Sequence, residues 1–277
     1  LMQYSEQAIF SKKLATIMRN VPIEIDMDSI KSKENFDADA LRKLFFRLQF
    51  KSLLERIPET AKPEPKQEAK TADFEYKKVE DVKAFSELSR LILANKDQKL
   101  FLSFTVLNEN TYSKLLIENL FVTFMGENFA VFFEKLMKEN AEAAIEESRK
   151  IFQDADITKI SFDMKNVYTA LNKLHIEPRG FEFDVKIAAY LVDASKGEYE
   201  LITLVREYLS EDPKGEGIEL SVKKNSYLEK LYQVLRRKIE EYDMEELLYN
   251  VELPLSYVLS VMEQNGFKVN TEKLNQI

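Results

Sequence analysis

Cysteine is absent from the sequence, which excludes disulfides and thiolate metal sites. A cytoplasmic protein is the simplest interpretation of that absence. Histidine occurs once, as His175, so a catalytic triad or a multi-histidine metal site would depend on a single imidazole. Because His175 follows a predicted helix, we expect it to interact with the C-terminal end of the helix dipole and not to take part in catalysis.

Glycine is scarce as well, with six in 277 residues. The phosphate-binding patterns G-x-x-x-x-G-K-[ST] and G-x-G-x-x-G do not occur, nor do H-E-x-x-H and EF-hand patterns, which argues against those nucleotide- and metal-binding folds. No apolar run approaches the roughly 18 residues that span a bilayer, and the first ten residues lack the pattern of a signal peptide. We therefore expect no membrane contact.

An excess of basic residues is also missing. The 48 acidic and 40 basic residues give a formal net charge of −8, whereas a stand-alone DNA-binding module is basic, so any contact with nucleic acid must be local. Hydrophobic residues make up 45% of the chain and aromatic residues 11%, which is enough to build a sizeable core. The length of 277 residues predicts two or more structural units.

The N-terminal part of the chain reads as helical. Apolar residues recur at helical spacing over 7–17 and again over 39–57. Residues 58–73 (PETAKPEPKQEAKTAD) contain three prolines, alternating charges and no large apolar side chain, so they cannot build a core. We interpret them as an exposed linker and a domain boundary.

Beyond a predicted helix at 79–95, the periodicity changes to that of strands. The runs 100–107, 119–125 and 129–133 are aromatic and β-branched and are separated by turn residues, a pattern typical of a strand meander. A helix at 134–152, a strand at 156–162 and further helices follow; these helices lie at 164–174, 185–192 and 199–209. A sheet covered by several helices is an α/β (α+β) domain.

The C-terminal part reads as a loop at 211–217 followed by amphipathic helices at 226–248 and 253–263. A third helix is predicted to begin with Thr271 as its N-cap. Because the helical pattern is interrupted at both ends of the sequence, we expect the chain to be cut from a longer one.

Carboxylates are plentiful, so composition permits a two-metal hydrolase, which needs acidic side chains on facing strands. The predicted central strand, 101–106, carries no acid, and the nearest is Glu109 in the following turn. Scattered acids of this kind are most often solvated surface residues.

Three separated stretches of the sequence carry a family resemblance. The first is SEQAIFSKKLATIMRNVPIEID followed by LRKLFFRLQFKSLLERI, the second is DMKNVYTALNKLHIEPRGFEFDVKIAAYLVD, and the third is NVELPLSYVLSVMEQNGFKVNTEKL. Together they resemble bacterial family A DNA polymerases, the DNA polymerase I family. The first resembles the end of the 5′ nuclease domain, the second is similar to the 3′-to-5′ exonuclease domain, and the third to the base of the polymerase thumb. Their order agrees with one continuous polymerase segment.

The resemblance implies four parts. Residues 1–57 would be the helical end of a 5′ nuclease domain, 58–76 a linker, 77–222 an exonuclease-like domain, and 223–277 the start of the polymerase domain. It also implies a ribonuclease H-like mixed sheet covered by helices, with helical flanks at both ends.

Active exonucleases of this family hold two metal ions with an Asp-x-Glu pair, a second-motif Asp and a Tyr-x-x-x-Asp. By the resemblance, the first pair falls on Phe104 and Val106, or on Ser103 and Thr105 if the alignment slips by one residue. The second-motif aspartate falls on Val167 and the third-motif aspartate near Asn225. Apolar and neutral side chains lack the charge that holds divalent ions, so the resemblance implies an inactive exonuclease without catalytic or metal-binding residues.

The function implied is that of a fragment of a DNA-directed DNA polymerase in DNA replication and repair, with the exonuclease-like domain as a non-catalytic platform. The fragment would need no cofactor. The parent polymerase would use magnesium, which would be bound by residues that this chain does not contain. DNA would be contacted through the parent protein, and we expect a monomer.

Two alternatives stay open. An active nuclease with relocated ligands would draw on Glu109, Asp163 and Asp184, although Asp184 more readily fixes local structure. A DNA- or partner-binding module would act through a basic stretch interleaved with glutamates, which is also typical of a solvated helix. The basic residues of that stretch are Lys223, Lys224, Lys230, Arg236, Arg237 and Lys238.

Overall fold

The computed structural model describes residues 5–17, 41, 44–45, 50, 53, 74–107 and 116–275. Contacts divide the chain into two units, Leu1–Ala61 and Lys62–Ile277. In the first unit, α1 (Ser5–Ala15) confirms a helix at the N-terminus, and its side chains are exposed. The predicted linker at 58–73 and most of the predicted helix at 39–57 lie outside the described residues, and the four-part division stays a prediction.

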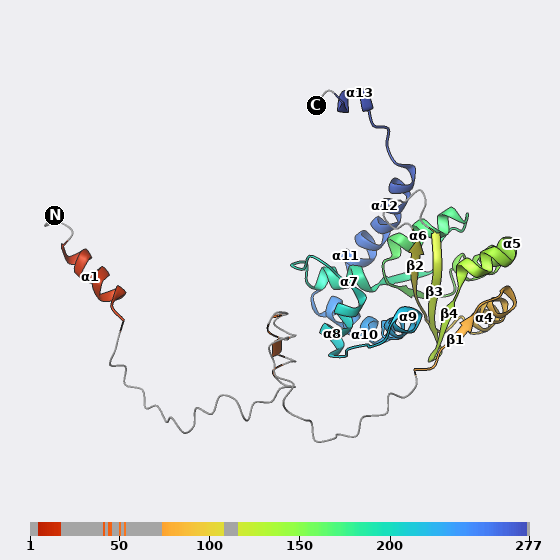
Figure 1. Cartoon of the computed structure of the whole chain (residues 1–277), viewed down its shortest axis with the longest axis horizontal. Helices are drawn as coiled ribbons and strands as arrows, with labels where there is room; N and C mark the ends of the chain where they lie inside the picture. Colours follow the sequence, from red (N-terminus) through yellow and green to blue (C-terminus); the bar gives the residue numbers. More distant parts are fainter. Residues whose placement is uncertain are drawn as a thin grey trace, which may run out of the picture. The chain divides into compact units, whose positions relative to one another are not determined.

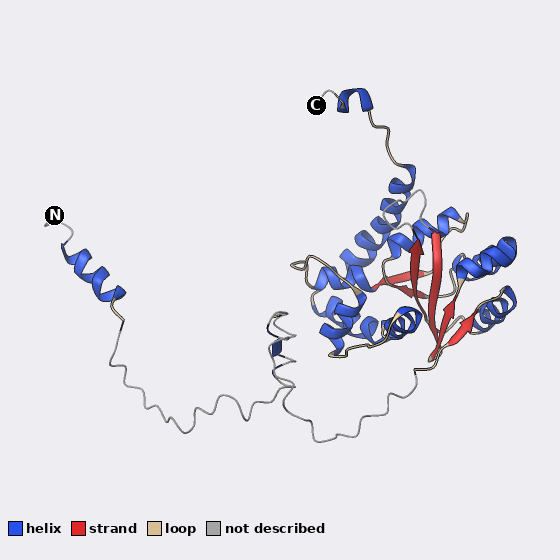
Figure 2. Ribbon diagram, in the orientation of Figure 1, coloured by secondary structure: helices blue, strands red, loops and turns tan. Residues whose placement is uncertain are grey.

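The described strands of the second unit form a six-stranded mixed sheet in the order β1-β4-β3-β2-β5-β6 (Figure 2). The strands are β1 (Lys77–Val79), β2 (Leu100–Leu107), β3 (Leu116–Phe124), β4 (Glu127–Val131), β5 (Lys159–Ser161) and β6 (Phe181–Asp184). The predicted meander is confirmed, because β3 runs antiparallel to both β2 and β4. In contrast, β5 and β6 continue the sheet in parallel from β2, and β1 joins β4 in parallel at the other edge.

Helices cover both faces of this sheet (Figure 1). On one face α4 (Val82–Ala94) and α5 (Phe133–Phe152) enclose a core with Leu100 and Leu102 of β2. Phe101 points to the other face because side chains alternate along a strand. The core on that face is completed by α7 (Val185–Val192), α8 (Leu201–Leu209) and α10 (Leu228–Glu241). The fold class predicted from periodicity is therefore confirmed.

Two further helices connect these layers. Helix α6 (Met164–Lys173) contributes Val167 to the first core and Tyr168 to the second. Helix α9 (Gly217–Ser226) packs on β3 and β4, where Val222 contacts Phe121.

The C-terminal helices follow α10. They are α11 (Glu245–Leu247), the π-helical turn η3 (Leu248–Glu252), α12 (Leu253–Asn265) and α13 (Thr271–Leu274). Helix α12 packs along α6. No helix within the described ranges is long and apolar enough to cross a membrane.

Three predictions about element bounds are wrong. The predicted helix at 79–95 is present as α4 but begins three residues later, because Val79 ends β1 and the N-cap Asp81 accepts a hydrogen bond from the Ala84 N–H at 2.7 Å. The predicted helix at 226–248 ends at Glu241, because Asp243 takes a left-handed backbone conformation with φ of 54°. The N-cap of α13 is Asn270 and not Thr271, since the Asn270 side chain accepts from the Lys273 N–H.

A buried lysine ties two loops to the sheet. Lys159 in β5 is fully buried, and its ammonium group donates to the carbonyl oxygens of Asp154 (2.8 Å), Ile157 (2.9 Å) and Arg179 (2.9 Å). The three N–H donors of the ammonium group are thereby satisfied inside the protein. Burial lowers the pKa of Lys159 to about 7. The turn before β5 and the loop before β6 are held together by this one side chain.

Gly180 is needed where these two segments meet. Its φ is +71°, and a Cβ atom there would lie 2.4 Å from the Ile157 carbonyl oxygen and 3.0 Å from the Lys159 Nζ. We predict that Gly180→Ala lowers the free energy of unfolding by about 3 kcal/mol or more, through steric overlap and the strained backbone. Urea denaturation followed by circular dichroism measures this change.

Gly126→Ala is the matched control. Gly126 has φ of +77° but nothing within 4 Å of a Cβ position, so this variant should lose only about 1 kcal/mol from backbone strain. Equal losses in the two variants would show that the close approach around Lys159 contributes nothing.

Candidate functional site

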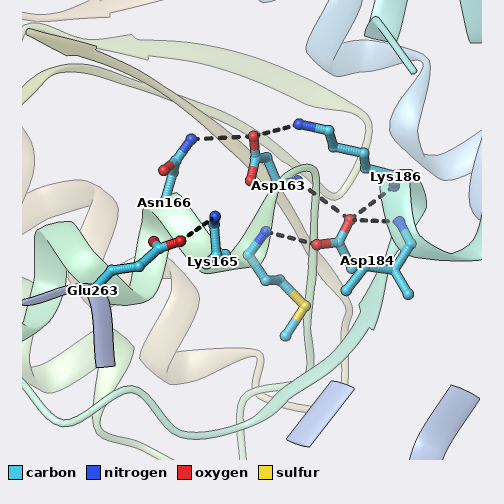
Figure 3. A network of polar contacts seen from close by, with 8 residues as sticks. Asp163, Lys165, Asn166, Asp184, Lys186 and Glu263 are labelled. Carbon is cyan, nitrogen blue, oxygen red and sulfur yellow. Dashed lines mark hydrogen bonds and ion pairs between the residues drawn. The ribbon is translucent and has the colours of Figure 1, made fainter. Parts of the chain in front are cut away.

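A buried carboxylate joins the starts of two helices (Figure 3). Asp184 ends β6 and is 1% exposed. Its Oδ2 accepts from the Met164 N–H at 2.6 Å, and its Oδ1 accepts from the Lys186 N–H at 2.7 Å. Two longer bonds from the N–H groups of Asp163 (3.2 Å) and Ile187 (3.4 Å) complete the set. Asp184 therefore caps both α6 and α7, as its expected structural role requires.

Asp163 lies beside this cap and faces a different set of partners. It has the left-handed conformation, with φ of 62° and ψ of 58°, which aspartate adopts more readily than most residues. Its Oδ2 accepts from the Lys186 ammonium group at 2.7 Å and from the Asn166 amide at 3.1 Å. The second carboxylate of the pair is thereby neutralised by a lysine.

A second contact, close to this cap, connects α6 to the C-terminal helices. Lys165, the second residue of α6, forms an ion pair with Glu263 of α12 at 2.8 Å (Figure 3). Beside it, the rings of Tyr168 and Tyr257 meet edge to face with their centroids 5.5 Å apart. The start of α6 is thus held by Asp184 on one side and by α12 on the other.

The charge on Asp184 is disfavoured by its surroundings. Burial raises its pKa to about 6, the nearby negative charge of Asp163 adds to the increase, and the backbone N–H donors reduce it.

The structure separates the residues that were predicted to stand at the exonuclease positions. Phe104, Val106 and Val167 come together in the apolar core beneath α4 and α5, where the Phe104 ring lies 6.0 Å from that of Phe152. Asn225 lies on the opposite face of β2, in α9. The correspondence of these residues to the family's motifs stays a prediction.

Asn225 forms a buried hydrogen-bond network with neutral partners. Its Oδ1 accepts from the Ser103 hydroxyl at 2.7 Å, and its Nδ2 donates to the Thr123 hydroxyl at 2.9 Å and to the Phe101 carbonyl oxygen at 3.4 Å. In the alternative alignment the first carboxylate pair falls on Ser103 and Thr105, and of these two residues Ser103 contacts Asn225. Thr105, the other, accepts from the Asn119 amide at 3.1 Å, directly across the ladder.

The remaining candidates are dispersed. Glu109 lies outside the described residues, and His175 is exposed just after α6. The basic stretch is divided between α9 and α10, where Lys230 pairs with Glu211 and Arg236 with Glu240. Within the described ranges, no three His, Asp or Glu side chains are grouped so that they could hold a metal ion.

Sequence reasoning does not find three residues of these networks. Thr123, Lys159 and Lys186 belong to no motif, and each acquires its role from partners far along the chain, such as Asn225 for Thr123. The identity of such partners depends on the tertiary fold.

Comparison with known proteins agrees with the geometry. Residues 102–215 match the family model of the DNA polymerase I ribonuclease H-like domain. The whole chain aligns at 27% identity with 31% of DNA polymerase I of Bacillus subtilis, and 98% of it at 27% identity with 29% of DNA polymerase I of Caldicellulosiruptor bescii. The chain thus spans about a third of the length of these curated relatives. The resemblance inferred from the three sequence stretches is confirmed.

Solved structures show the same fold. The POL domain of Pol1 from M. smegmatis, in complex with DNA primer-template and dNTP, has a TM-score of 0.59 at 20% identity, over 69% of this chain and 32% of that one. Escherichia coli RNase D, an exoribonuclease, has a TM-score of 0.54 at 15% identity, over 70% of this chain and 52% of that one. The ribonuclease H-like fold of the exonuclease type is therefore confirmed.

The raised pKa of Asp184 predicts a pH-dependent stability. Because the folded protein favours the protonated carboxyl, this contribution is fully present below the unfolded value near 3.8 and is lost as the pH rises through about 6. We expect the Asp184→Asn variant, whose side chain cannot ionise, to lack this decrease in the free energy of unfolding with rising pH. Unfolding free energies of both proteins between pH 4 and pH 8 measure it, and parallel curves for the two proteins would contradict the assignment.

The Asn225 network predicts coupling between residues far apart in sequence. Asn225→Ala and Ser103→Ala should each destabilise the fold by about 1–3 kcal/mol, because each leaves a buried polar partner unsatisfied. In the double variant, the two losses should fall short of additivity by about 1 kcal/mol. Ser226→Ala, next to Asn225 but bonded only locally to the Lys223 carbonyl oxygen, is the control and should be additive with Ser103→Ala.

Proposed function

We propose, from the homology of the whole chain to a segment of bacterial DNA polymerase I, that its ribonuclease H-like domain is a non-catalytic structural platform. The chain would act in DNA replication and repair as part of a DNA-directed DNA polymerase. In this role the domain carries and orients the helices that follow it, and it hydrolyses no DNA.

The observation that carries this proposal is the neutral network of Ser103, Thr123 and Asn225. Two divalent ions held 3.5 to 4 Å apart need several carboxylates to balance their charge. Here the buried groups where β2, β3 and α9 meet are hydroxyls and an amide, and they satisfy one another at 2.7 and 2.9 Å. This donor set does not fit a two-metal centre.

The two described acidic residues considered as relocated ligands, Asp163 and Asp184, support the same conclusion. Both oxygens of Asp184 accept backbone N–H groups, and Asp163 is paired with Lys186. A metal ion at this pair would have to displace the lysine and the helix caps. Relocation of the exonuclease ligands to Asp163 and Asp184 is therefore disfavoured.

The platform role is supported by the contacts between α6 and α12. The Lys165–Glu263 ion pair and the Tyr168–Tyr257 ring contact connect the exonuclease-like domain to a helix in the stretch that resembles the base of the polymerase thumb. A half-buried ion pair and an edge-to-face ring contact fix direction as well as distance. They would hold the following domain at a defined angle.

The other parts of the proposal concern the parent polymerase. Magnesium would act in its polymerase domain, DNA would be bound through the parent protein, and the protein would be a cytoplasmic monomer. The relative from M. smegmatis, solved with DNA primer-template and dNTP, supports the contact with DNA.

We predict that the chain releases no nucleotides from 5′-labelled single-stranded DNA in the presence of magnesium or manganese. Denaturing gel electrophoresis of timed samples measures this. Metal-dependent release that Asp163→Asn abolishes would overturn the platform proposal and establish relocated ligands.

Asp156→Asn serves as the matched control for that assay. Asp156 is an exposed acid at the turn before β5, and its carboxylate lies 4.0 Å from the Lys96 ammonium group. Cleavage that survives both substitutions unchanged would be assigned to a contaminating nuclease, and the proposal would stand.

A further inference from the structure

A large pocket lies beside the edge strand β6, and its lining residues include neither Asp184 nor Asn225. Its volume is about 760 Å³. It is bounded by β6, by the loop before it, and by side chains of α6, α10, η3 and α12. A pocket of this size accommodates several side chains of a binding partner.

Tyrosines dominate the wall of this pocket. Tyr168, Tyr232, Tyr249 and Tyr257 line it together with Phe181 and Phe183. Edge-to-face contacts fix several of these rings, since the centroids of Phe183 and Tyr232 lie 4.9 Å apart and those of Tyr168 and Phe181 5.3 Å apart. Rigid aromatic walls offer ring faces to a cation at little entropic cost.

The charged residues of the pocket are mainly acidic. Glu177, Glu182 and Glu245 line it and are exposed, although Glu177 is already paired with Arg179 at 2.9 Å, and the one lining arginine is Arg236. The Arg236 guanidinium group is already paired with Glu240 at 2.9 Å, so it offers little positive charge to a ligand. The chain as a whole also carries a net charge of −8. Phosphate groups are repelled from such a pocket, and cations are attracted to it.

The edge strand β6 offers an unpaired edge along which a ligand could align. Among the described strands, β6 pairs with β5 and ends the sheet order, so its second edge faces no other strand. Phe181, Glu182 and Phe183 of this strand all line the pocket. Extended peptides bind along such edges, where pockets accept their alternate side chains.

We propose that the tyrosine-lined pocket beside β6 binds an extended segment of a partner protein that carries arginine or lysine side chains. The cationic groups lie against the tyrosine faces and near Glu182 and Glu245, and the segment follows β6. Arginine is preferred to lysine, because its planar guanidinium group stacks on aromatic rings. This inference is independent of whether the exonuclease-like domain cleaves DNA.

The test uses the 277-residue chain and a blocked peptide in which arginine alternates with valine, titrated by isothermal calorimetry at low salt. We expect saturable binding that weakens as salt is added, weaker binding when lysine replaces arginine, and none when glutamate replaces it. Equal binding of the glutamate peptide would overturn the proposal. Saturable binding of a short single-stranded DNA to the chain in the absence of peptide, weakened by Tyr249→Leu, would also overturn it and assign the pocket to nucleic acid.

Paired charge-reversal variants locate the site. Glu245→Lys should weaken binding of the arginine peptide about fivefold or more, because an attractive charge becomes a repulsive one. Glu246→Lys makes the same change one residue away, at an exposed position outside the pocket lining, and should leave the affinity within error. Equal loss in the two variants would show that binding follows net charge alone and would refute the site.

A second pair tests the aromatic wall. Tyr249 is 39% exposed and lines the pocket, whereas Tyr242 is 49% exposed and does not. We expect Tyr249→Leu to lower the affinity severalfold and Tyr242→Leu to leave it unchanged, with the folding of each variant checked by circular dichroism.

Sedimentation of the free chain tests whether the pocket binds a second copy of the chain. A dimer that is present in the unmodified chain and absent in Glu245→Lys would assign the pocket to that second copy and would overturn the proposal.

Discussion

The hydrogen bonds from the starts of α6 and α7 to the buried carboxylate of Asp184 hold the domain together at the end of its sheet. Asp184 terminates β6 and accepts hydrogen bonds from the first turns of both helices, so one side chain fixes their starts relative to each other. Helix α6 then contributes to the cores on both faces of the sheet, and α12 packs along it. The position of the C-terminal helices therefore follows from a polar contact at the sheet end, and the apolar surfaces complete the packing.

Three buried polar side chains of this domain, Lys159, Asp184 and Asn225, are satisfied by the backbone and by other side chains. Lys159 uses three carbonyl oxygens, Asp184 four N–H groups, and Asn225 two hydroxyls and one carbonyl oxygen. Each set joins segments that are separated in sequence. Hydrogen bonds fix the relative position of such segments more narrowly than non-directional apolar contacts do. A domain proposed to serve as a support has reason to keep such directional contacts. They fix geometry even where no chemistry depends on it.

Much of the fold could be predicted from the sequence because its signals are local. The run at 100–107 alternates between two buried faces and is rich in aromatic and β-branched residues, and β2 has these bounds. In contrast, β6 has four residues, and its pairing with β5 arises only in the folded chain, so no local pattern identifies it. The break at Asp243 is hidden because the amphipathic period continues through it. The Asn225 network could not be found for a related reason, since Ser103 and Asn225 are 122 residues apart.

The pairing of β1 with β4 bears on how the domain avoids aggregation. β1 has three residues, and it covers the edge formed by Phe129, Ala130 and Val131, with Lys77 anchored to Glu127 at 2.7 Å. An uncovered edge of this apolar composition is a template for strands of other molecules. A shortened chain that began after Val79 would keep most of its core and would still present that edge. The short strand β1 therefore protects the β4 edge from pairing with strands of other molecules.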